Sequence, residues 1–472
     1  MAQGRTKFLV IGLDSMPANV LFEELKDELP NLKKMINNGI SSILESCHPP
    51  ITIPAWMVMM TSKNPGKLGI YGFRHRKGPS YNEGWIANSQ SIKERKVWDY
   101  LAQAGKRVCL VGVPPSYPPL QVNGKMVSCF ITPSDQNQYT YPIEFKQDIE
   151  NLVGKYLFDV VFRTEDRDAI LKQLYDMTEK RFKLIRHLIT TESWDYMMFV
   201  EIGVDRLHHA FWKFHDKTHP KYVPGNKYEN VIREYYKLID QRIGELLSLI
   251  DDDTYVLVVS DHGTAAMKGC FCVNEWMIRE GYLNLKKYPD KQTELDKCEV
   301  DWSKTKAWGW GGYYARIFMN VKGREPSGMI PKEEYESARE ELRQKLMKVK
   351  GPNGELFKNK VFTPEELYGE PVGDKPDLMV YFDDLFWRSA GTIGHNLLYL
   401  SENDTGPDDS VHWYDGIFIL YNKKMKNGKK LDRMTIYDVA PSILEIMQMP
   451  VPPDMEGKII PEIKLWVKNL ND

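Results

Sequence analysis

The stretch Phe8-Leu-Val-Ile-Gly-Leu13, followed directly by Asp14, decides the fold. A short run that is apolar throughout is typical of a strand buried on both faces, as in a parallel sheet covered by helices. Two later runs repeat the arrangement, because Tyr196–Val200 precedes Asp205 and Tyr255–Val259 precedes Asp261. The carboxyl ends of parallel strands form the edge where open α/β sheets bind ligands. We therefore expect the three carboxylates to meet at one edge of one sheet.

Predicted helices alternate with these strands. They cover residues 31–38, 55–61, 97–104 and 229–249, and a further strand is expected at 107–113. Alternating strands and helices are typical of a parallel sheet with helices on both faces. The predicted fold class is α/β, with a central, mostly parallel sheet flanked by helices.

Two segments interrupt this alternation. Residues 133–191 contain charged helical patterns without a clear strand, which predicts a helical insertion or cap. Residues 281–373 form a second, α+β insertion that contains a polar helix. The remaining ranges are predicted to build the catalytic core; they are 1–132, 192–280 and 374–472.

Bulk properties narrow the function classes. The net charge of −2 provides no basic field for nucleic acid, and no stretch is apolar and long enough to span a bilayer. The first residues enter the first strand without a secretory signal pattern, and the six cysteines show no CxxC pair. These features predict a cytoplasmic enzyme with reduced thiols.

The acidic residues come with histidines at metal-ligand spacing. Asp205 and His209 are four apart and would share one face of a helix, and His262 follows Asp261 at a strand end. With Asp14, and with His412 just before a later strand, this makes six candidate ligands, enough for two ions. Zinc tolerates such a mixed nitrogen and oxygen set best, although manganese or iron also fits.

Less specific interpretations exist for each of these residues alone. An aspartate after a strand is often only a helix N-cap, and a single histidine is more often a surface or core residue than a ligand. We place three further histidines in that second category: His208, His215 and His219. The joint placement of the six candidates at strand ends favours a metal centre.

Thr52 lies in the segment Pro49-Pro-Ile-Thr-Ile-Pro-Ala-Trp56, between prolines that lead into a predicted helix. Its hydroxyl could serve as the N-cap of that helix. Alternatively it could be a nucleophile activated by a metal and aimed at phosphorus, at a helix N-terminus that favours anions. The residues alone leave both interpretations open.

In this order, Asp14, Thr52-Ile-Pro, Asp205-x-x-x-His209, Asp261-His262-Gly263 and His412 resemble the nucleotide pyrophosphatase/phosphodiesterase branch of the alkaline phosphatase superfamily. The chain is more similar still to the prokaryotic cytoplasmic relatives described as phosphohydrolases or phosphomutases. The resemblance covers nearly the whole chain. It implies an alkaline-phosphatase-like fold and a two-metal phosphodiesterase or phosphohydrolase. The expected substrate is a small phosphate ester or a nucleotide-type molecule.

The resemblance also implies roles for the residues. One ion would be held by Asp205, His209 and His412. The other would be held by the side chains of Asp14, Thr52, Asp261 and His262. Thr52 would attack phosphorus in line and form a phospho-threonine intermediate, which water then hydrolyses.

One residue departs from the family pattern. After the threonine-hydrophobic-proline sequence the pyrophosphatases commonly have an asparagine that donates to phosphate, and here Ala55 stands instead. Basic residues could replace that donor; the candidates are Lys67, Arg74, Arg76 and Arg206. The run 74–77 could equally be a solvated loop. The aromatic run 308–312 could stack on a base or pack in the core.

Other functions compete with the hydrolase. A phosphomutase of the same superfamily would need a closed site, for which residues 133–191 could supply a lid. A sulfatase is disfavoured because Thr52 stands without the cysteine or serine and the arginine of that pattern. A non-catalytic binding module is disfavoured because every expected ligand is present. The physiological substrate and the oligomeric state do not follow from the sequence.

Overall fold

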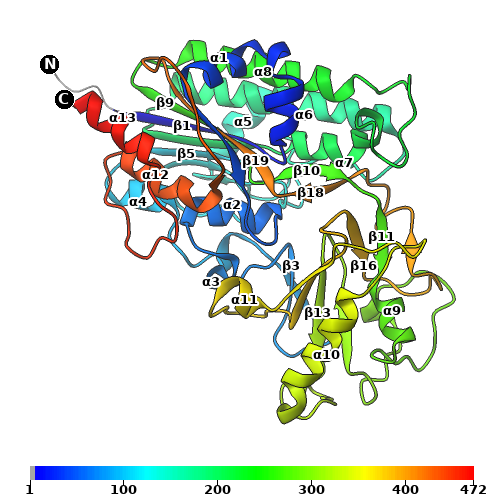
Figure 1. The fold of residues 1–472 in the computed structure, drawn as a ribbon. Coiled ribbons are helices and arrows are strands. Elements are labelled where there is room, and N and C mark those ends of the chain that lie inside the picture. Colours follow the sequence, from blue (N-terminus) through cyan, green and yellow to red (C-terminus); the bar gives the residue numbers. More distant parts are fainter. Residues whose placement is uncertain (1–5, 472) are drawn as a thin grey trace.

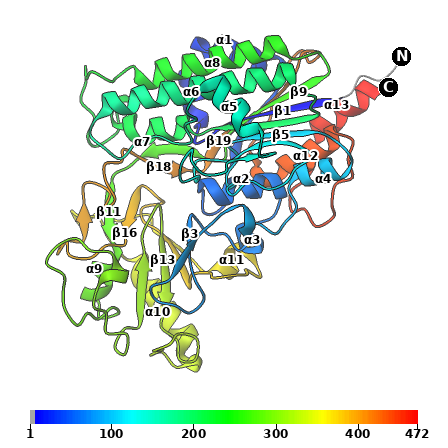
Figure 2. The same ribbon diagram turned by 180° about the vertical axis from the view of Figure 1, so that it is seen from behind.

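The computed structural model describes residues 6–471, which are built around one ten-stranded sheet (Figures 1 and 2). Its strands are β1 (Lys7–Leu13), β2 (Ile40–Glu45), β5 (Val108–Val111), β6 (Gly124–Val127), β7 (Thr140–Tyr141), β8 (Tyr196–Glu201), β9 (Thr254–Val259), β19 (Asp415–Asn422), β20 (Lys429–Lys430) and β21 (Met434–Thr435). The order is β20-β2-β19-β9-β1-β8-β5-β6-β7, and β21 also pairs with β2.

The middle of the sheet, from β9 through β1, β8 and β5 to β6, is parallel. β19 runs antiparallel between β2 and β9. Successive residues of β1 face opposite sides, so that Ile11 packs in one hydrophobic core and Val10 in the other. The apolar run was therefore correctly predicted to be buried on both faces, and the α/β fold class is confirmed.

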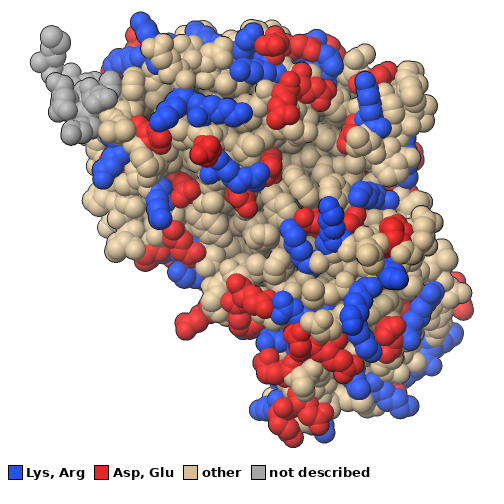
Figure 3. All heavy atoms as spheres, viewed as in Figure 1, with Lys and Arg blue, Asp and Glu red and all other residues tan. Residues whose placement is uncertain are grey.

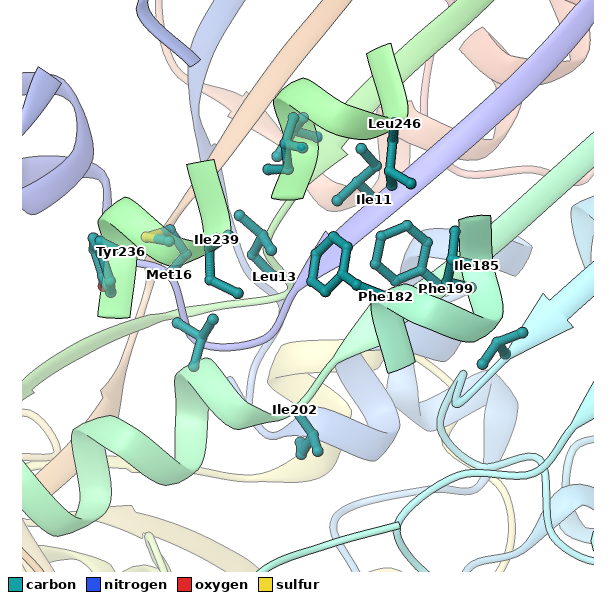
Figure 4. Close-up of a cluster of buried hydrophobic side chains, with 14 of the residues drawn as sticks. Ile11, Leu13, Met16, Phe182, Ile185, Phe199, Ile202, Tyr236, Ile239 and Leu246 are labelled. Carbon is teal, nitrogen blue, oxygen red and sulfur yellow. The ribbon is translucent and has the colours of Figure 1, made fainter. Parts of the chain in front are cut away.

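Helices cover both faces of the sheet (Figure 1). On one face lie α1 (Pro30–Asn38), α5 (Phe145–Val153), α6 (Arg167–Thr191), α7 (Gly203–His215) and α8 (Val231–Leu249). On the other lie α2 (Thr52–Thr61), α4 (Val97–Gln103), α12 (Val439–Ile446) and α13 (Pro461–Asn471), with the short α3 (Pro65–Leu68) after α2. Figure 4 shows the first interface, where Ile11 and Phe199 of the sheet meet Phe182 of α6 and Leu246 of α8.

The segment 133–191, expected as a helical cap, is placed mainly within these layers. β7 adds to the edge of the central sheet, and α6 packs beside α7 and α8 over its face. Apolar residues of α6 such as Ile170 and Leu174 are buried there, and charged residues such as Asp168 and Lys183 are exposed on the outward face. Two charged residues of this helix, Arg167 and Arg181, are buried. Only the connection before α6 borders the site described below. The division into a core and two insertions stays a prediction.

A smaller unit lies beside the edge of the central sheet that follows the carboxyl ends of β1, β8 and β9 (Figure 1). Its elements are β11 (Gly269–Cys272), α9 (Val273–Arg279), β12 (Ala307–Trp310), β13 (Ala315–Met319), α10 (Tyr335–Met347), β14 (Lys360–Phe362), α11 (Pro364–Tyr368), β15 (Leu378–Tyr381), β16 (Trp387–Ala390) and β17 (Tyr399–Leu400). They form a four-stranded sheet, β12-β13-β15-β14, and a three-stranded sheet, β16-β11-β17.

β15 lies in the range 374–472 that we assigned to the catalytic core, but it pairs with β13 and β14 of the smaller unit. Its residues Leu378 and Val380 pack in a separate hydrophobic core. A hairpin of β3 (Arg74–Arg76) and β4 (Gly84–Ile86) reaches this unit from the region after α2.

On the face drawn in Figure 3, acidic and basic side chains are interspersed, in keeping with the net charge of −2.

Candidate metal centre and substrate cavity

The three strand-end carboxylates lie together because β9, β1 and β8 are parallel neighbours. Asp14 follows β1 directly, and Asp261 comes two residues after β9. Asp205 lies in the first turn of α7, which begins just after β8. All three side chains are buried at the carboxyl edge of the sheet.

His262 joins two groups of possible metal ligands. Asp14, Asp261 and His262 have ligand atoms within 4.8 Å of one another, and so do Asp205, His262 and His412. The Nε2 atom of His262 lies 3.3 Å from Asp261 Oδ2 and 3.7 Å from Asp14 Oδ1. An ion bound by either group would therefore lie next to His262.

His209 and His412 complete the second group. The Nε2 atom of His209 lies 3.3 Å from Asp205 Oδ1, as the spacing on one helix face predicts, and that of His412 lies 3.4 Å from the same oxygen. His412 belongs to β18 (Ser410–Trp413), which pairs with β10 (Gly263–Ala266) directly after His262. This pairing stacks the rings of His412 and His262 with their centroids 3.8 Å apart.

The carboxylates present free oxygens to the histidines. Each aspartate has one oxygen with a hydrogen-bond donor: Asp14 Oδ2 accepts from Trp56 Nε1, and Asp261 Oδ1 accepts from the Ser15 amide. The other oxygen is buried and has no hydrogen-bond partner among residues 6–471; this holds for Asp14 Oδ1, Asp205 Oδ1 and Asp261 Oδ2. A buried anion without a partner is costly, and these three oxygens are the ones that face the Nε2 atoms.

The other ring nitrogen of each histidine has an acceptor. His262 Nδ1 lies 3.0 Å from the Gly263 carbonyl and His412 Nδ1 lies 3.0 Å from the Pro50 carbonyl. His209 Nδ1 lies 2.6 Å from Asp408 Oδ1. Donation from Nδ1 leaves the lone pair of Nε2 available for a cation, which is the usual outer arrangement of metal-binding histidines. The residues present therefore fit divalent metal ions.

The electrostatics of the site also favour a cation. Burial, and then the charge of a neighbouring aspartate, raises the pKa of Asp14 and of Asp261 well above the ordinary value. Burial lowers the pKa of His412 to about 4 and holds that of His262 well below the ordinary value. A divalent cation would stabilise the charged carboxylates and bind the neutral rings of His262 and His412, so it matches both tendencies. His209 differs, because against burial the charge of Asp408 raises its pKa well above the ordinary value.

Thr52 and Trp56 reach the site from α2. Thr52 is the first residue of the helix; Ile51 occupies the cap position, and no side chain caps that end. The Thr52 hydroxyl lies 3.4 Å from His262 Nε2. The indole of Trp56 packs over Gly12, where an added Cβ would lie 2.5 Å from its ring, and this close approach lets it donate to Asp14. The sequence pattern left a capping role open, and the structure gives Thr52 no cap bond.

A family model described as type I phosphodiesterase/nucleotide pyrophosphatase matches residues 8–408, the stretch that contains most of this site. The chain belongs to that family. It is a metal-dependent phosphoric ester hydrolase, and the resemblance found from its motifs is confirmed.

Solved structures show the same fold. Murine ectonucleotide pyrophosphatase/phosphodiesterase 5, as an inactive threonine-to-alanine variant in complex with AMP, has a TM-score of 0.56 and 11% identity, covering 95% of this chain and 96% of its own. The human protein has a TM-score of 0.55 and 14% identity, covering 96% and 97%. A comparison with curated proteins gave no match. None of the helices within residues 6–471 has the length and apolar character to cross a membrane. The cytoplasmic location stays a prediction.

A cavity of about 690 Å³ adjoins the candidate metal-ligand residues of this phosphodiesterase. Arg206, next to Asp205, lines it, as does Arg74 of β3. The other two predicted substrate-binding residues lie elsewhere: Lys67 pairs with Glu456 at 3.0 Å, and Arg76 pairs with Glu325 at 2.9 Å. A substrate-binding role stays a prediction for all four, and the structure favours Arg74 and Arg206.

The two tryptophans of the run 308–312 have different environments. Trp308 is fully buried in the core of the smaller unit, whereas Trp310 lines the cavity. Trp308 therefore packs in the core, and only Trp310 is placed where it could stack on a substrate.

Sequence reasoning missed three residues beside the ligands. The Tyr313 hydroxyl lies 3.1 Å from His209 Nε2, and its ring stacks on His412 with centroids 3.7 Å apart. Asp408 orients His209 and lies 2.5 Å from Arg388 Nη1. The acidic pair Asp408-Asp409 shortly before His412 was a usable signal for this support. Tyr313 and Arg388 had none, because their positions depend on the smaller unit.

We expect Asp408→Ala to weaken metal binding by about 10- to 100-fold, the usual cost of losing the group that orients a metal-binding histidine. The loss should appear in competition titrations with a metal-sensitive dye. Asp409→Asn is the matched control, because its carboxylate faces Lys213 and Arg167 and not a ligand side chain. Equal affinities for Asp408→Ala and the control would show that the contact to His209 is unimportant.

Proposed function

We propose that this phosphodiesterase hydrolyses a phosphate ester or nucleotide-type substrate through a phospho-threonine on Thr52. Two divalent cations would be held by the six aspartates and histidines. The observation that carries the proposal is the position of the Thr52 hydroxyl, 3.4 Å from the shared ligand His262 and free of any capping role. The start of α2 also favours a phosphoryl anion at this point.

The proposed ligand sets follow the two groups in the site. Asp205, His209 and His412 would hold one ion. Asp14, Asp261 and His262, with the Thr52 oxygen, would hold the other. When bound, the two cations would supply Lewis-acid stabilisation on the attacking and leaving sides of phosphorus. The mixed nitrogen and oxygen donors favour zinc, with manganese or iron as alternatives.

The residues of the chain would carry the bond changes in two steps. Thr52 Oγ1 forms a bond to phosphorus as it loses its proton, while the bond from phosphorus to the leaving oxygen breaks and that oxygen gains a proton. Water then attacks phosphorus, the bond to Oγ1 breaks, and a proton from the water restores the hydroxyl. The guanidinium of Arg206 lines the cavity beside Asp205, and a phosphate oxygen would have to share it with Asp159 and Asp205, which already accept its hydrogen bonds.

A screen of phosphomonoesters and phosphodiesters with zinc, manganese and magnesium tests this proposal. We expect metal-dependent release of product from diesters, with free phosphate appearing from monoesters only as a minor activity. A phosphomutase would instead return the phosphoryl group to the product, so isomerised phosphate ester without free phosphate would overturn the hydrolase. A chain that turns over no ester with any metal would revive the binding-module alternative.

The metal content is a separate expected result. Two ions per chain should be found by elemental analysis, about 3.5–4 Å apart as in other two-metal sites. Anomalous scattering from crystals grown with zinc should place both beside His262. A single ion at full loading, or ions away from Asp14 and Asp261, would contradict the two-metal assignment.

A further inference from the structure

The cavity contains a second group of arginines away from the metal ligands. Arg316 of β13 and Arg74 of β3 both line it. Arg316 is only 9% exposed, and its guanidinium donates to the backbone carbonyl of Arg74. Across residues 6–471, neither guanidinium forms an ion pair with a carboxylate. Two acids also line this cavity, Glu294 and Asp296. Glu294 is bound by Lys297 at 2.7 Å, and the charges of Lys297 and then of Arg74 lower its pKa.

The other arginines of the cavity are neutralised by carboxylates. Arg206 binds Asp159 with contacts of 2.7 and 2.9 Å and also contacts Asp205. Arg388 and Arg163 both contact Asp408. Burial alone would lower the pKa of Arg206 and of Arg388, but these carboxylates raise it. The positive charge at this end of the cavity therefore already has protein partners.

Arg316 lacks this compensation. Burial lowers its pKa, and the charge of Arg74 lowers it further. Its guanidinium lies over the ring of Trp310, 5.3 Å from the centroid, which compensates the charge only in part. A buried charge without a counter-ion is costly, so an arginine kept in this state favours an anion that the protein itself does not supply.

The side chain of Arg316 lies near that of Ile51, the residue before Thr52. An added Cβ on Gly72 would be 3.9 Å from Arg316 Nη1 and 3.9 Å from Ile51 Cδ1, so both atoms border the same point. No hydrogen bond or ion pair joins Arg316 to any of the six metal-ligand residues described here. An anion at Arg316 would thus lie in the cavity that Ile51 also lines, away from the candidate metal ligands.

We propose that Arg316 and Arg74 form a second anion subsite, which binds a carboxylate or phosphate that the substrate carries in addition to its reacting phosphoryl group. The inference rests on the proposed function. It narrows the substrate class to phosphate esters with a second anionic group a few bonds from the reacting phosphorus. Guanidinium groups suit this task because they bind carboxylate and phosphate oxygens in pairs.

Competitive inhibition of the metal-loaded enzyme tests the subsite. The probes are propylphosphonate, 3-phosphonopropanoate and propane-1,3-bisphosphonate, which share one phosphonate and differ in the group at the other end. We expect each probe with a second anion to bind about tenfold or more tightly than propylphosphonate, the effect of one charge-assisted pair. The carboxylate and phosphonate arms show which second group the subsite prefers.

Variants then locate the effect. Arg316→Met keeps the length and the apolar stem of the side chain. It should bring the ratio of the affinities for probes with and without a second anion close to one. Arg316→Lys should restore part of the preference for the second anion, and Arg74→Gln should reduce it. Lys77→Met is the matched control, because Lys77 follows β3, pairs with the exposed Glu83 and does not line the cavity. It should keep the wild-type preference.

Three outcomes would overturn the subsite. One is a wild-type enzyme without preference. The second is an Arg316→Met variant that weakens all three probes equally, because Arg316 would then hold the phosphoryl group itself. The third is a wild-type preference for the second anion in both Arg74→Gln and Arg316→Lys. These two milder variants keep the test valid if Arg316→Met does not fold. Calorimetric titration of the same probes needs no turnover, so a failure to hydrolyse any ester would count against the proposed function alone.

Discussion

Replacing Thr52 with alanine should lower turnover by roughly 10⁴-fold or more, the scale seen when covalent nucleophiles are removed from other enzymes. Its hydroxyl lies 3.4 Å from His262 Nε2 and caps no helix, so it has no structural task that would explain such a loss. Thr52→Ser should retain part of the activity because the hydroxyl remains. Initial rates with a chromogenic diester measure the effect.

The comparison requires that the fold and metals survive. Circular dichroism and elemental analysis of Thr52→Ala should match the wild type closely, since the six aspartates and histidines remain. Rapid quenching of the wild-type reaction should trap phosphate on residue 52. Near-native rates in Thr52→Ala would instead mean that water attacks phosphorus directly and that Thr52 only borders the site.

Removing the metal ions should abolish hydrolysis and lower the melting temperature. The fall in melting temperature should be larger at higher pH. The pKa values of Asp14 and Asp261 are raised in the folded, metal-free chain. As pH rises, these carboxyl groups therefore lose their protons at a lower pH in the unfolded chain than in the folded one. As pH rises above the unfolded-state value of about 3.9, the stripped protein therefore loses stability from these groups. A bound cation removes that cost. At a thousandfold excess over the dissociation constant, binding contributes about 4 kcal/mol.

Scanning calorimetry with and without a chelator, at pH 5 and pH 7.5, measures this difference. Asp261→Asn should lose much of the metal-dependent rise in melting temperature. Asp168→Asn is the matched control, because that carboxylate is exposed and pairs with Lys227. A metal effect that shrinks from pH 5 to 7.5, or that is the same in both variants, would argue against ions bound at these carboxylates.

Local sequence determined the parts of the protein that depend on chain direction and short spacing. The apolar run of β1 predicts a strand buried on both faces, and parallel pairing then brings Asp14, Asp205 and Asp261 to one edge. The spacing of Asp205 and His209 likewise requires only one helix. The ordered motifs, taken with the family they resemble, pointed to the phosphodiesterase before any contact was known.

The sequence was less informative wherever a residue depends on packing between distant segments. β15 has the same apolar pattern as a core strand, and only its partners place it in the smaller unit. The charged pattern of α6 indicated a helix but not that its apolar side would cover the central sheet. The sequence favoured Arg74 and Arg76 over Lys67 without separating the first two. In the structure Lys67 and Arg76 pair with carboxylates, whereas within residues 6–471 no carboxylate forms an ion pair with Arg74.

What the sequence alone determined is the set of candidate groups for binding metal and for reaction, because strand ends and helix turns place them by local geometry. The tertiary structure alone decided what surrounds them. Tyr313, Arg388 and Arg316 reach the cavity from the smaller unit, more than a hundred residues after Asp205 along the chain. Whether an arginine is neutralised or left for a ligand depends on which carboxylate packs against it, and no spacing within a single segment encodes that contact.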